Sequence, residues 1–335
     1  MSDTLPDAAA PSGLVRAEEV AFRVDGVDYR WAHVFAHARS TGDWRTLETE
    51  VRQALACRTL ATAQGPPLLP GAERPLAVAF RRARRLHAAE DVEAWLAARG
   101  LTVAQWRGYL RGEALRRRHA AELDTVVERY PVDDAVVERA LGVWGLCSSA
   151  FPRWAGQLAT RAAAAHAICE RAGTPPPDRG DLAALEEHYD GFAADVASPR
   201  RLQALLDSRY LDWLRLDAET AVFEDRDTAA EALLCVRDDG WSLSEAAHAG
   251  RARLRRHRLL VEDVDADARP HLVRARDGDL LGPLPLGGQP ALVRVLRKDA
   301  PSLEDDELRL KATRELVGTA AAREVADRVE WLHPR

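Results

Sequence analysis

The sequence predicts an α+β protein that is mostly helical and contains one compact stretch of mixed strands and helices. Apolar residues recur at helical spacing from Trp31 to Ser208. Between Tyr210 and Lys298 the pattern changes to strand, helix, helix, strand, strand. A long helix with a wide apolar face follows over Ser302–Leu332, and a helix with so much apolar surface needs a partner.

Composition indicates a globular chain without strong electrostatic attraction to polyanions. The chain has 335 residues, 47% of them hydrophobic and 30% charged, and this length allows two domains. The net charge of -6 gives no whole-chain reason to expect nucleic acid or an anionic membrane as a partner. We interpret the basic runs Arg81–Arg85, Arg116–Arg118 and Arg251–Arg258 as solvated helix faces rather than phosphate tracks.

The first residues and the cysteines favour a cytoplasmic protein. Residues 1–16 are small, polar and proline-containing, which predicts a disordered leader and not a signal peptide, and no later stretch approaches a membrane span. Four scattered cysteines are interpreted as buried reduced thiols, and we expect no metal or cofactor. They are Cys57, Cys147, Cys169 and Cys235.

The N-terminal half is predicted to be a β-hairpin followed by helices. The stretch VAFRVDGVDYRW alternates around Asp25-Gly26, a pair that suits the positive φ angles of a tight turn. Gln105 lies three residues after Thr102, as in a capping box. The apolar pattern over 136–172 suggests a helical hairpin. The expected helices are Trp31–Ser40, Trp44–Gln64, Pro75–Ala88, Val92–Ala98, one from Thr102, one from Asp133 or Asp134 to Leu146, and Phe151–Ala172.

The second half is predicted to contain the mixed stretch and its flanking helices. Residues 174–180 have the composition of a linker, and a helix over Pro199–Ser208 leads into the first strand. The elements expected next are a strand over Trp213–Asp217, a helix after Asp225 or Asp227, a helix capped by Ser242 or Ser244, strands over Leu281–Pro285 and Ala291–Val295, and the final helix capped by Ser302.

Two sets of residues resemble known families. The mixed stretch resembles the parvulin (PpiC-type) peptidyl-prolyl isomerase domain, and the N-terminal hairpin with its helices resembles the SurA and PrsA chaperones. The first resemblance rests on Gly240, Ser242, Leu243, Ala246, Ala247, Gly282, Pro283, Leu284 and the run from Gln289 to Val295. The second rests on the hairpin around Asp25 and on the turn Gly100-Leu101-Thr102 before a helix. It implies that the last helix returns to the N-terminal helices, so that a parvulin-like domain is inserted into a SurA-like body. The implied domains are a leader (1–16), a helical chaperone-like domain (17–173), a linker (174–180), a parvulin-like domain (181–300) and a C-terminal helix (301–335).

The parvulin resemblance also locates the expected catalytic positions. It implies one histidine on the first strand, at about Asp212 or Trp213, and another on the last strand, at Ala291. Neither position holds histidine, so we expect little or no isomerase activity. His248, His257 and His271 leave a displaced site as an alternative, but we interpret them as ordinary surface or helix residues. Weaker candidates are interpreted as structural: Cys147-Ser148-Ser149 with His166 or His188 as cap and buried thiol, and Asp263, Asp265 and Asp267 as an acidic loop.

We therefore expect a binding module that holds an extended peptide in an apolar cleft. The chain also resembles PpiC-related proteins of bacterial systems that mature ribosomally made peptides, which implies a precursor peptide as client and peptide-modifying enzymes as partners. An enzyme acting on a peptide and a nucleic-acid regulator remain the alternatives, and we expect neither a nucleic acid nor a membrane as partner. Aromatic side chains combine apolar area with a polar group, so the candidate peptide-binding residues are Trp106, Tyr109, Trp144, Trp154, Tyr189, Trp213 and Trp241.

Overall fold

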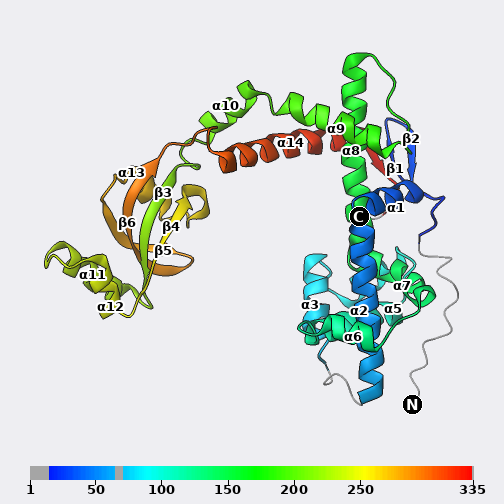
Figure 1. Ribbon diagram of the computed structural model, residues 1–335, viewed down its shortest axis with the longest axis horizontal. Helices are drawn as coiled ribbons and strands as arrows, with labels where there is room; N and C mark the ends of the chain where they lie inside the picture. The colour runs from blue at the N-terminus through cyan, green and yellow to red at the C-terminus, as the bar shows by residue number, and fades with distance from the viewer. Residues whose placement is uncertain (1–14, 65–70, 334–335) are drawn as a thin grey trace. The chain divides into compact units, whose positions relative to one another are not determined.

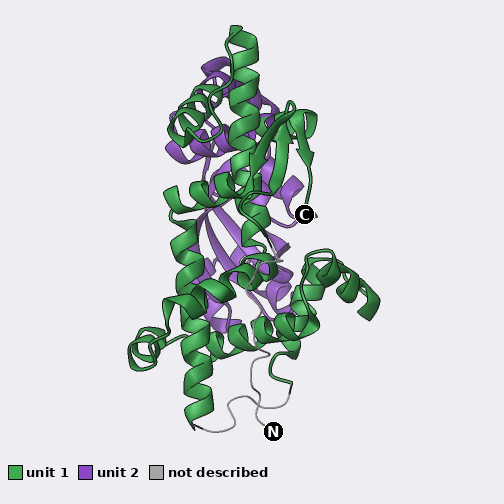
Figure 2. Cartoon of the chain, turned by 90° about the vertical axis from the view of Figure 1, so that its right-hand side faces the viewer, with its two compact units in different colours: residues 1–192, 321–335 green, residues 193–320 purple. Residues whose placement is uncertain are grey.

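The computed structural model describes residues 15–64 and 71–333, and the chain divides into two compact units (Figure 1, Figure 2). The first unit comprises residues 1–192 and 321–335, and the second comprises residues 193–320. Each boundary falls inside a helix, namely α9 (Leu182–Val196) and α14 (Asp306–Arg328). Most of the predicted leader, residues 1–14, lies outside the described residues. Among the described residues no helix is both long and apolar enough to cross a membrane.

The first unit contains a small sheet made from both ends of the chain. Strands β1 (Val20–Val24) and β2 (Val27–Arg30) form the predicted hairpin, and Asp25 and Gly26 have φ angles of 48° and 82°, as a two-residue hairpin turn requires. Strand β7 (Val329–Trp331) pairs antiparallel with the other side of β1. The end of the chain is therefore part of the same sheet as its beginning.

Helices build the rest of the first unit, largely where the apolar pattern predicts them. Helix α3 ends at Ala83, five residues before its predicted end, because the chain turns there and Arg85 takes a φ of 56°. The pattern also missed the break that separates α5 from α6. The helices are α1 (Trp31–Ser40), α2 (Asp43–Gln64), α3 (Arg74–Ala83), α4 (Ala89–Ala97), α5 (Val103–Arg118), α6 (Leu123–Arg129), α7 (Asp134–Cys147) and α8 (Ala150–Ala172).

Helices α7 and α8 are joined by Ser148 and Ser149 and contact each other, as the predicted helical hairpin requires. Helix α7 also packs on α2 and α5, whereas α8 packs on α1 and β1. Aromatic rings fill the core where α1, α2 and α8 meet. Among them, the ring of Phe151 contacts the rings of Trp31 and Trp154. The pair α7–α8 therefore connects the helical part of the unit to its sheet.

The second unit is built on an antiparallel sheet of strand order β4-β3-β6-β5. The prediction was incomplete, because β4 and α13 were not expected and β3 begins two residues later than predicted. Strand β4 has the sequence RLRRHRLL, which shows no alternation of apolar and polar residues. The elements are α10 (Pro199–Ser208), β3 (Arg215–Val222), α11 (Arg226–Arg237), α12 (Leu243–Ala249), β4 (Arg253–Leu260), a 3-10 turn (Val261–Asp263), α13 (Arg269–Arg274), β5 (Leu280–Leu286) and β6 (Gln289–Asp299).

Both faces of this sheet are covered by helices. One face buries Ala218 and Val293 together with Leu272 of α13. The other face buries Ala221 with apolar residues of α11 and α12, whose predicted caps Asp225 and Ser242 each accept a backbone N–H bond. Successive strand residues point to opposite faces, so β3 contributes Ala218 to one cluster and Ala221 to the other.

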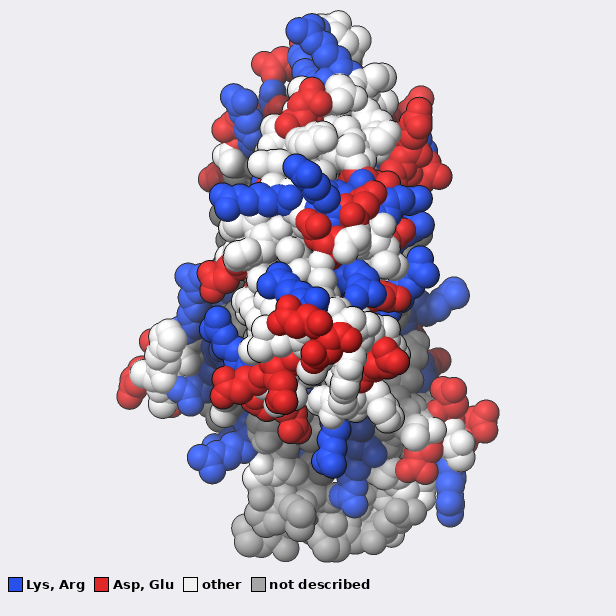
Figure 3. Space-filling view, turned by 90° about the vertical axis from the view of Figure 1, so that its left-hand side faces the viewer, with Lys and Arg blue, Asp and Glu red and all other residues white. Residues whose placement is uncertain are grey.

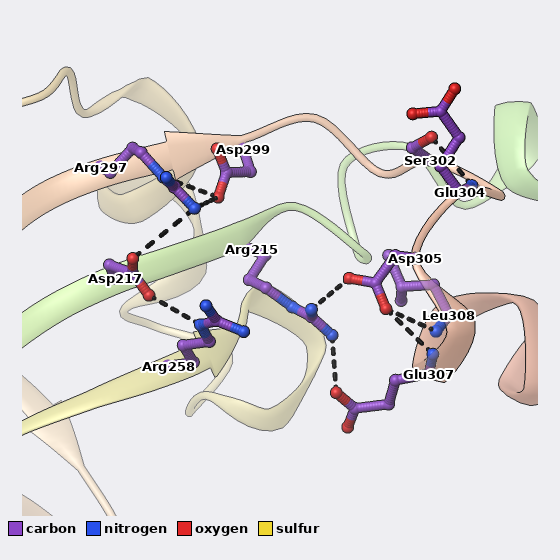
Figure 4. Close-up of polar contacts among 10 residues, drawn as sticks. All are labelled: Arg215, Asp217, Arg258, Arg297, Asp299, Ser302, Glu304, Asp305, Glu307 and Leu308. Atoms are coloured by element: carbon purple, nitrogen blue, oxygen red, sulfur yellow. Dashed lines mark hydrogen bonds and ion pairs between the residues drawn. The ribbon is translucent and has the colours of Figure 1, made fainter.

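Charged side chains connect the end of the sheet to α14 (Figure 4). Arg215 is only 8% exposed and pairs with Asp305 and with Glu307, whose carboxylate is 2.8 Å away. Asp305 also accepts the backbone N–H groups of Glu307 and Leu308 and so caps the first turn of α14. This buried arginine therefore fixes the start of α14 against the first strand of the sheet.

Candidate peptide-binding site

A cavity of about 240 Å³ opens in the first unit where α2, α5 and α7 meet the start of α8. Its aromatic residues are two of the predicted candidates, Tyr109 and Trp144, whose rings lie edge to face with centroids 5.4 Å apart. The cavity is lined by Asp43, Thr46, Leu47, Glu50, Tyr109, Glu113, Arg116, Trp144, Ser148, Ala150 and Arg153.

The start of α5 places these aromatic residues. Thr102 Oγ1 accepts the N–H of Gln105 at 3.2 Å, and the Gln105 side chain accepts the N–H of Thr102, which completes the predicted capping box. Gly112 then lets the ring of Trp144 lie directly on the helix, because a Cβ at this position would come within 2.7 Å of that ring. Helix start and glycine together fix the aromatic side of the cavity.

Paired charges form the polar side of the cavity. Glu113 is 8% exposed and accepts two hydrogen bonds from Arg116, at 3.1 and 3.2 Å, and Glu50 lies 3.9 Å from the same guanidinium. Burial alone would lower the pKa of Arg116, but the two carboxylates outweigh it and the pKa is raised. Burial, with the charge of Glu113, also raises the pKa of Tyr109, so the phenol is neutral at pH 7. The cavity thus offers aromatic surface beside compensated charges.

These charged residues were missed in the sequence, although a signal for them exists. Glu113 and Arg116 follow Tyr109 by four and seven residues, which places all three on one face of α5. A carboxylate on an otherwise apolar stripe needs a partner when it is buried. The combination of spacing and residue type therefore indicates a polar site in the stripe.

The other predicted aromatic residues are distributed over both units. Trp106 is half-buried beside Phe80, and Trp154 is fully buried in the core of the first unit. Tyr189 of α9 is half-buried under Arg161, whose guanidinium lies 5.2 Å from its ring centroid. These positions do not bring the three residues into the cavity.

The second unit holds the last two candidates. Trp213 is fully buried, packs with Leu308 of α14 and donates its indole N–H to Glu262 at 3.0 Å. Trp241 is 41% exposed between α11 and α12. Core packing therefore accounts for Trp213, whereas Trp241 is the exposed member of the predicted set.

The two residues at the first catalytic position implied by the parvulin resemblance do not lie on the first strand, as that position requires. Asp212 and Trp213 lie in the turn before β3, so the strand cannot present either of them. The β3 residue that pairs with Ala291 is Val222, and Leu284 of β5 pairs with Ala291 on its other side. The three paired residues Val222, Ala291 and Leu284 are all apolar. Two residues before Val222, Thr220 Oγ1 lies 3.0 Å from Nε2 of His257 on β4.

The candidate nucleophile and bases in the first unit are held in structural contacts. Burial raises the pKa of the Cys147 thiol to about 12, so it stays protonated at neutral pH. His188 Nδ1 contacts the backbone oxygen of Ala184 at 2.7 Å, which is a bond within α9. His166 lies sixteen residues after Ala150 on α8, about 24 Å along the helix axis.

A second cavity of about 380 Å³ surrounds His166 near the β1–β2 turn. His166 Nδ1 lies 3.1 Å from the Asp25 carboxylate, which also accepts a 2.8 Å hydrogen bond from Arg328 of α14. Burial lowers the pKa of His166, so the ring is neutral at pH 7 and can donate to Asp25 from Nδ1. Arg328 also bonds Glu170 and Glu324, and this network therefore connects α8, the hairpin turn and α14.

Metal coordination is not supported by side-chain clusters in the part of the chain that the structure describes. Residues 15–64 and 71–333 contain no group of three His, Cys, Asp or Glu side chains placed to hold a metal ion. Asp265 of the predicted acidic loop accepts a hydrogen bond from the backbone N–H of Gly288 at 3.3 Å.

Comparisons with known proteins give structural similarities that cover most of the chain but have low scores. No family model and no curated protein matches the chain. The crystal structure of PrsA from Bacillus subtilis aligns with 10% identity and a TM-score of 0.22, over 93% of this chain and 92% of that chain. A structure described with the SurA-like chaperones PEB4 and Cj1289 of Campylobacter jejuni aligns with 9% identity and a TM-score of 0.19, over 94% and 100%. The helices and strands described above define the α+β fold.

Proposed function

We propose that the chain is a peptide-binding chaperone or carrier. The observation that supports this best is the cavity at Tyr109 and Trp144. At about 240 Å³ it is smaller than the roughly 300–1,000 Å³ of sites for drug-sized ligands, and its size suits one peptide side chain. An aromatic surface buries apolar area on binding, while the paired charges at Glu50, Glu113 and Arg116 offer hydrogen-bonding groups to a peptide backbone.

We further propose that the parvulin-like unit is catalytically degenerate. Rotation about a prolyl peptide bond faces a barrier of about 20 kcal/mol, and an enzyme lowers it with preorganised polar groups. Ala291, at the last-strand position that the resemblance implies, and Val222, which pairs with it across β3 and β6, have no side-chain donor or acceptor. This supports binding without isomerisation.

The client that we propose is a ribosomally made precursor peptide, presented to peptide-modifying enzymes. This part of the proposal rests on the sequence resemblance to PpiC-related maturation proteins. The alternative is an enzyme that modifies or isomerises such a peptide.

A retention experiment with mass spectrometry tests the proposal. The full chain is incubated with a pool of unstructured peptides that includes candidate precursor peptides, and the bound peptides are recovered and weighed. We expect retained peptides of unchanged mass. A mass change that requires only this protein would make it an enzyme, and accelerated exchange of an X-Pro peptide measured by NMR would make it an isomerase.

Two tryptophan substitutions on α2 locate the binding site. Thr46 lies on the rim of the cavity and is exposed, so Thr46→Trp fills the opening without disturbing the core. Thr49 is exposed on the same helix but does not line the cavity, and Thr49→Trp is the matched control. We expect Thr46→Trp to weaken retention about tenfold, which corresponds to 1.4 kcal/mol, and Thr49→Trp to leave it unchanged. Equal retention by both variants and the native chain would exclude this cavity.

A further inference from the structure

Strand β4 is a long, regular edge strand. It occupies one end of the strand order β4-β3-β6-β5, and its eight residues pair with β3 without a register shift. Apart from its bonds within the sheet, none of its backbone groups bonds another backbone group among the described residues. In an edge strand, alternate N–H and C=O groups point away from the neighbouring strand and can accept a further strand.

The side chains of this edge carry one sign of charge. Arg253, Arg255, Arg256 and Arg258 are all exposed, and β4 contains no acidic residue. On the face of the molecule drawn in Figure 3, Lys and Arg side chains stand among Asp and Glu side chains. The earlier interpretation of this basic run as a solvated helix face is therefore wrong, because its residues form an edge strand.

The two arginines at the start of β4 have no acidic residue opposite them on β3. Arg258 lies 3.1 Å from Asp217 of β3 (Figure 4), and Arg256 lies opposite Glu219. Arg255 and Arg253 lie opposite Thr220 and Val222, and neither arginine forms an ion pair with the described residues. Since they are two positions apart in the strand, both side chains project from the same face of the sheet.

The opposite edge of the sheet differs in the features that block strand addition. Strand β5 contains Pro283 and Pro285, which have no N–H to donate, and its pairing with β6 shifts register between Leu281 and Leu284. Natural edge strands are commonly protected by prolines, irregular pairing, short length or charged side chains. Strand β4 has only the last of these protections, and its positive charge repels cationic strands but attracts anionic ones.

We propose that the outer edge of β4 binds an acidic extended peptide as an added strand. Two carboxylates at positions i and i+2 of that peptide lie opposite Arg253 and Arg255. Guanidinium groups bind carboxylates with two parallel hydrogen bonds, and cross-strand pairs of opposite charge stabilise antiparallel strands. The inference rests on the proposed function, because it names the chemical class of peptide that the chain would carry.

Fluorescence anisotropy with the full chain and designed peptides at 150 mM salt tests the proposal. The probe is a labelled octapeptide in which Glu alternates with Thr and Val, and the comparison peptides replace Glu with Lys or methylate alternate backbone amides. We expect binding by the acidic peptide, none by the Lys peptide, and at least tenfold weaker binding by the N-methylated peptide, which keeps the charge but loses donors to the strand edge. Equal affinity of the methylated and unmethylated acidic peptides would show charge attraction without strand addition and overturn the proposal.

Charge reversal locates the site. Arg253→Glu combined with Arg255→Glu is expected to weaken the acidic peptide at least tenfold. Arg82→Glu combined with Arg107→Glu makes the same change in net charge at exposed helix positions of the first unit and is expected to have little effect. Circular dichroism checks that both double variants keep their fold. An equal loss in both would assign the binding to net charge and contradict the proposal.

Two further probes separate this inference from the proposed function. A peptide recovered in the retention experiment is measured beside the acidic octapeptide. If it binds in a manner sensitive to Thr46→Trp while the acidic peptide does not bind, the β4 proposal fails and the proposed function stands. If the retention experiment recovers no peptide and the acidic peptide does not bind, both fail. A single-stranded oligothymidylate that binds through Arg253 and Arg255 in place of the acidic peptide would make the edge a nucleic-acid contact and also overturn the proposal.

Discussion

Replacing Gly112 with alanine tests the packing on which the candidate cavity depends. A Cβ at this position would lie 2.7 and 3.0 Å from two carbons of the Trp144 ring and 3.3 Å from Cβ of Ala54. Contacts under 3.0 Å force a neighbour to move, and the tryptophan ring is held between α5 and α7. The substitution therefore changes both the free energy of unfolding and the shape of the cavity.

The expected magnitude is the balance of two opposing effects. Alanine is favoured over glycine inside a helix by about 1 kcal/mol. Forcing an extra methyl group into a packed core costs about 1–3 kcal/mol. We expect Gly112→Ala to lower the free energy of unfolding by about 1 kcal/mol and to weaken peptide retention, because Trp144 must leave its position on α5.

Gly108 provides a matched control in the same helix. A Cβ built there meets nothing within 4 Å, so Gly108→Ala carries the helix preference without the steric cost and is expected to raise stability by up to about 1 kcal/mol. The two variants should differ by about 2 kcal/mol in urea unfolding followed by tryptophan fluorescence. If Gly112→Ala is as stable as Gly108→Ala, Trp144 does not rest on Gly112 and the described cavity is wrong.

Three further outcomes follow from the contacts of the first unit. Burial lowers the pKa of His166 below its ordinary value of 6.5, so the unfolded chain binds a proton more readily than the folded chain. The stability of the native chain therefore falls as the pH drops below 6.5. In denaturant titrations, His166→Gln should lose less unfolding free energy between pH 7 and pH 5 than the native chain. Arg328→Met leaves three carboxylates without their shared cation and should lower the free energy of unfolding by about 2 kcal/mol. Arg323→Met, at a side chain that is 83% exposed, should lower it by about 0.5 kcal/mol or less. Thermal unfolding at low and high salt compares the two variants. Cys235, which is partly exposed, should react with a thiol reagent in the folded protein at pH 8, while buried thiols such as Cys147 should react only after unfolding. Rapid labelling of all four cysteines in the native state would contradict the described burial.

Local signals in the sequence predicted the elements whose ends are fixed by particular residues. Asp25-Gly26, the capping pair at Thr102 and the cap at Ser242 depend on contacts within a few residues, and each was found where predicted. Strand β4 was missed because its partner β3 lies about forty residues earlier, and an edge strand with both faces exposed needs no alternation. Strand β4 is defined by its pairing with β3 across the sheet, and no local pattern in the sequence contains that pairing.

The candidate cavity shows the same limit for a functional site. Tyr109 and Trp144 were selected as aromatic residues, but spacing alone does not distinguish a ring at a cavity from one in the core, such as Trp154. The cavity residue Tyr109 differs from the core residue Trp154 because Glu113 and Arg116 lie on the same face of its helix. A buried carboxylate such as that of Glu113 would be costly in a purely apolar core. A charged residue that continues an apolar helical stripe, with an opposite charge three residues later, is therefore a better marker of a binding cavity in this chain than the aromatic residues themselves.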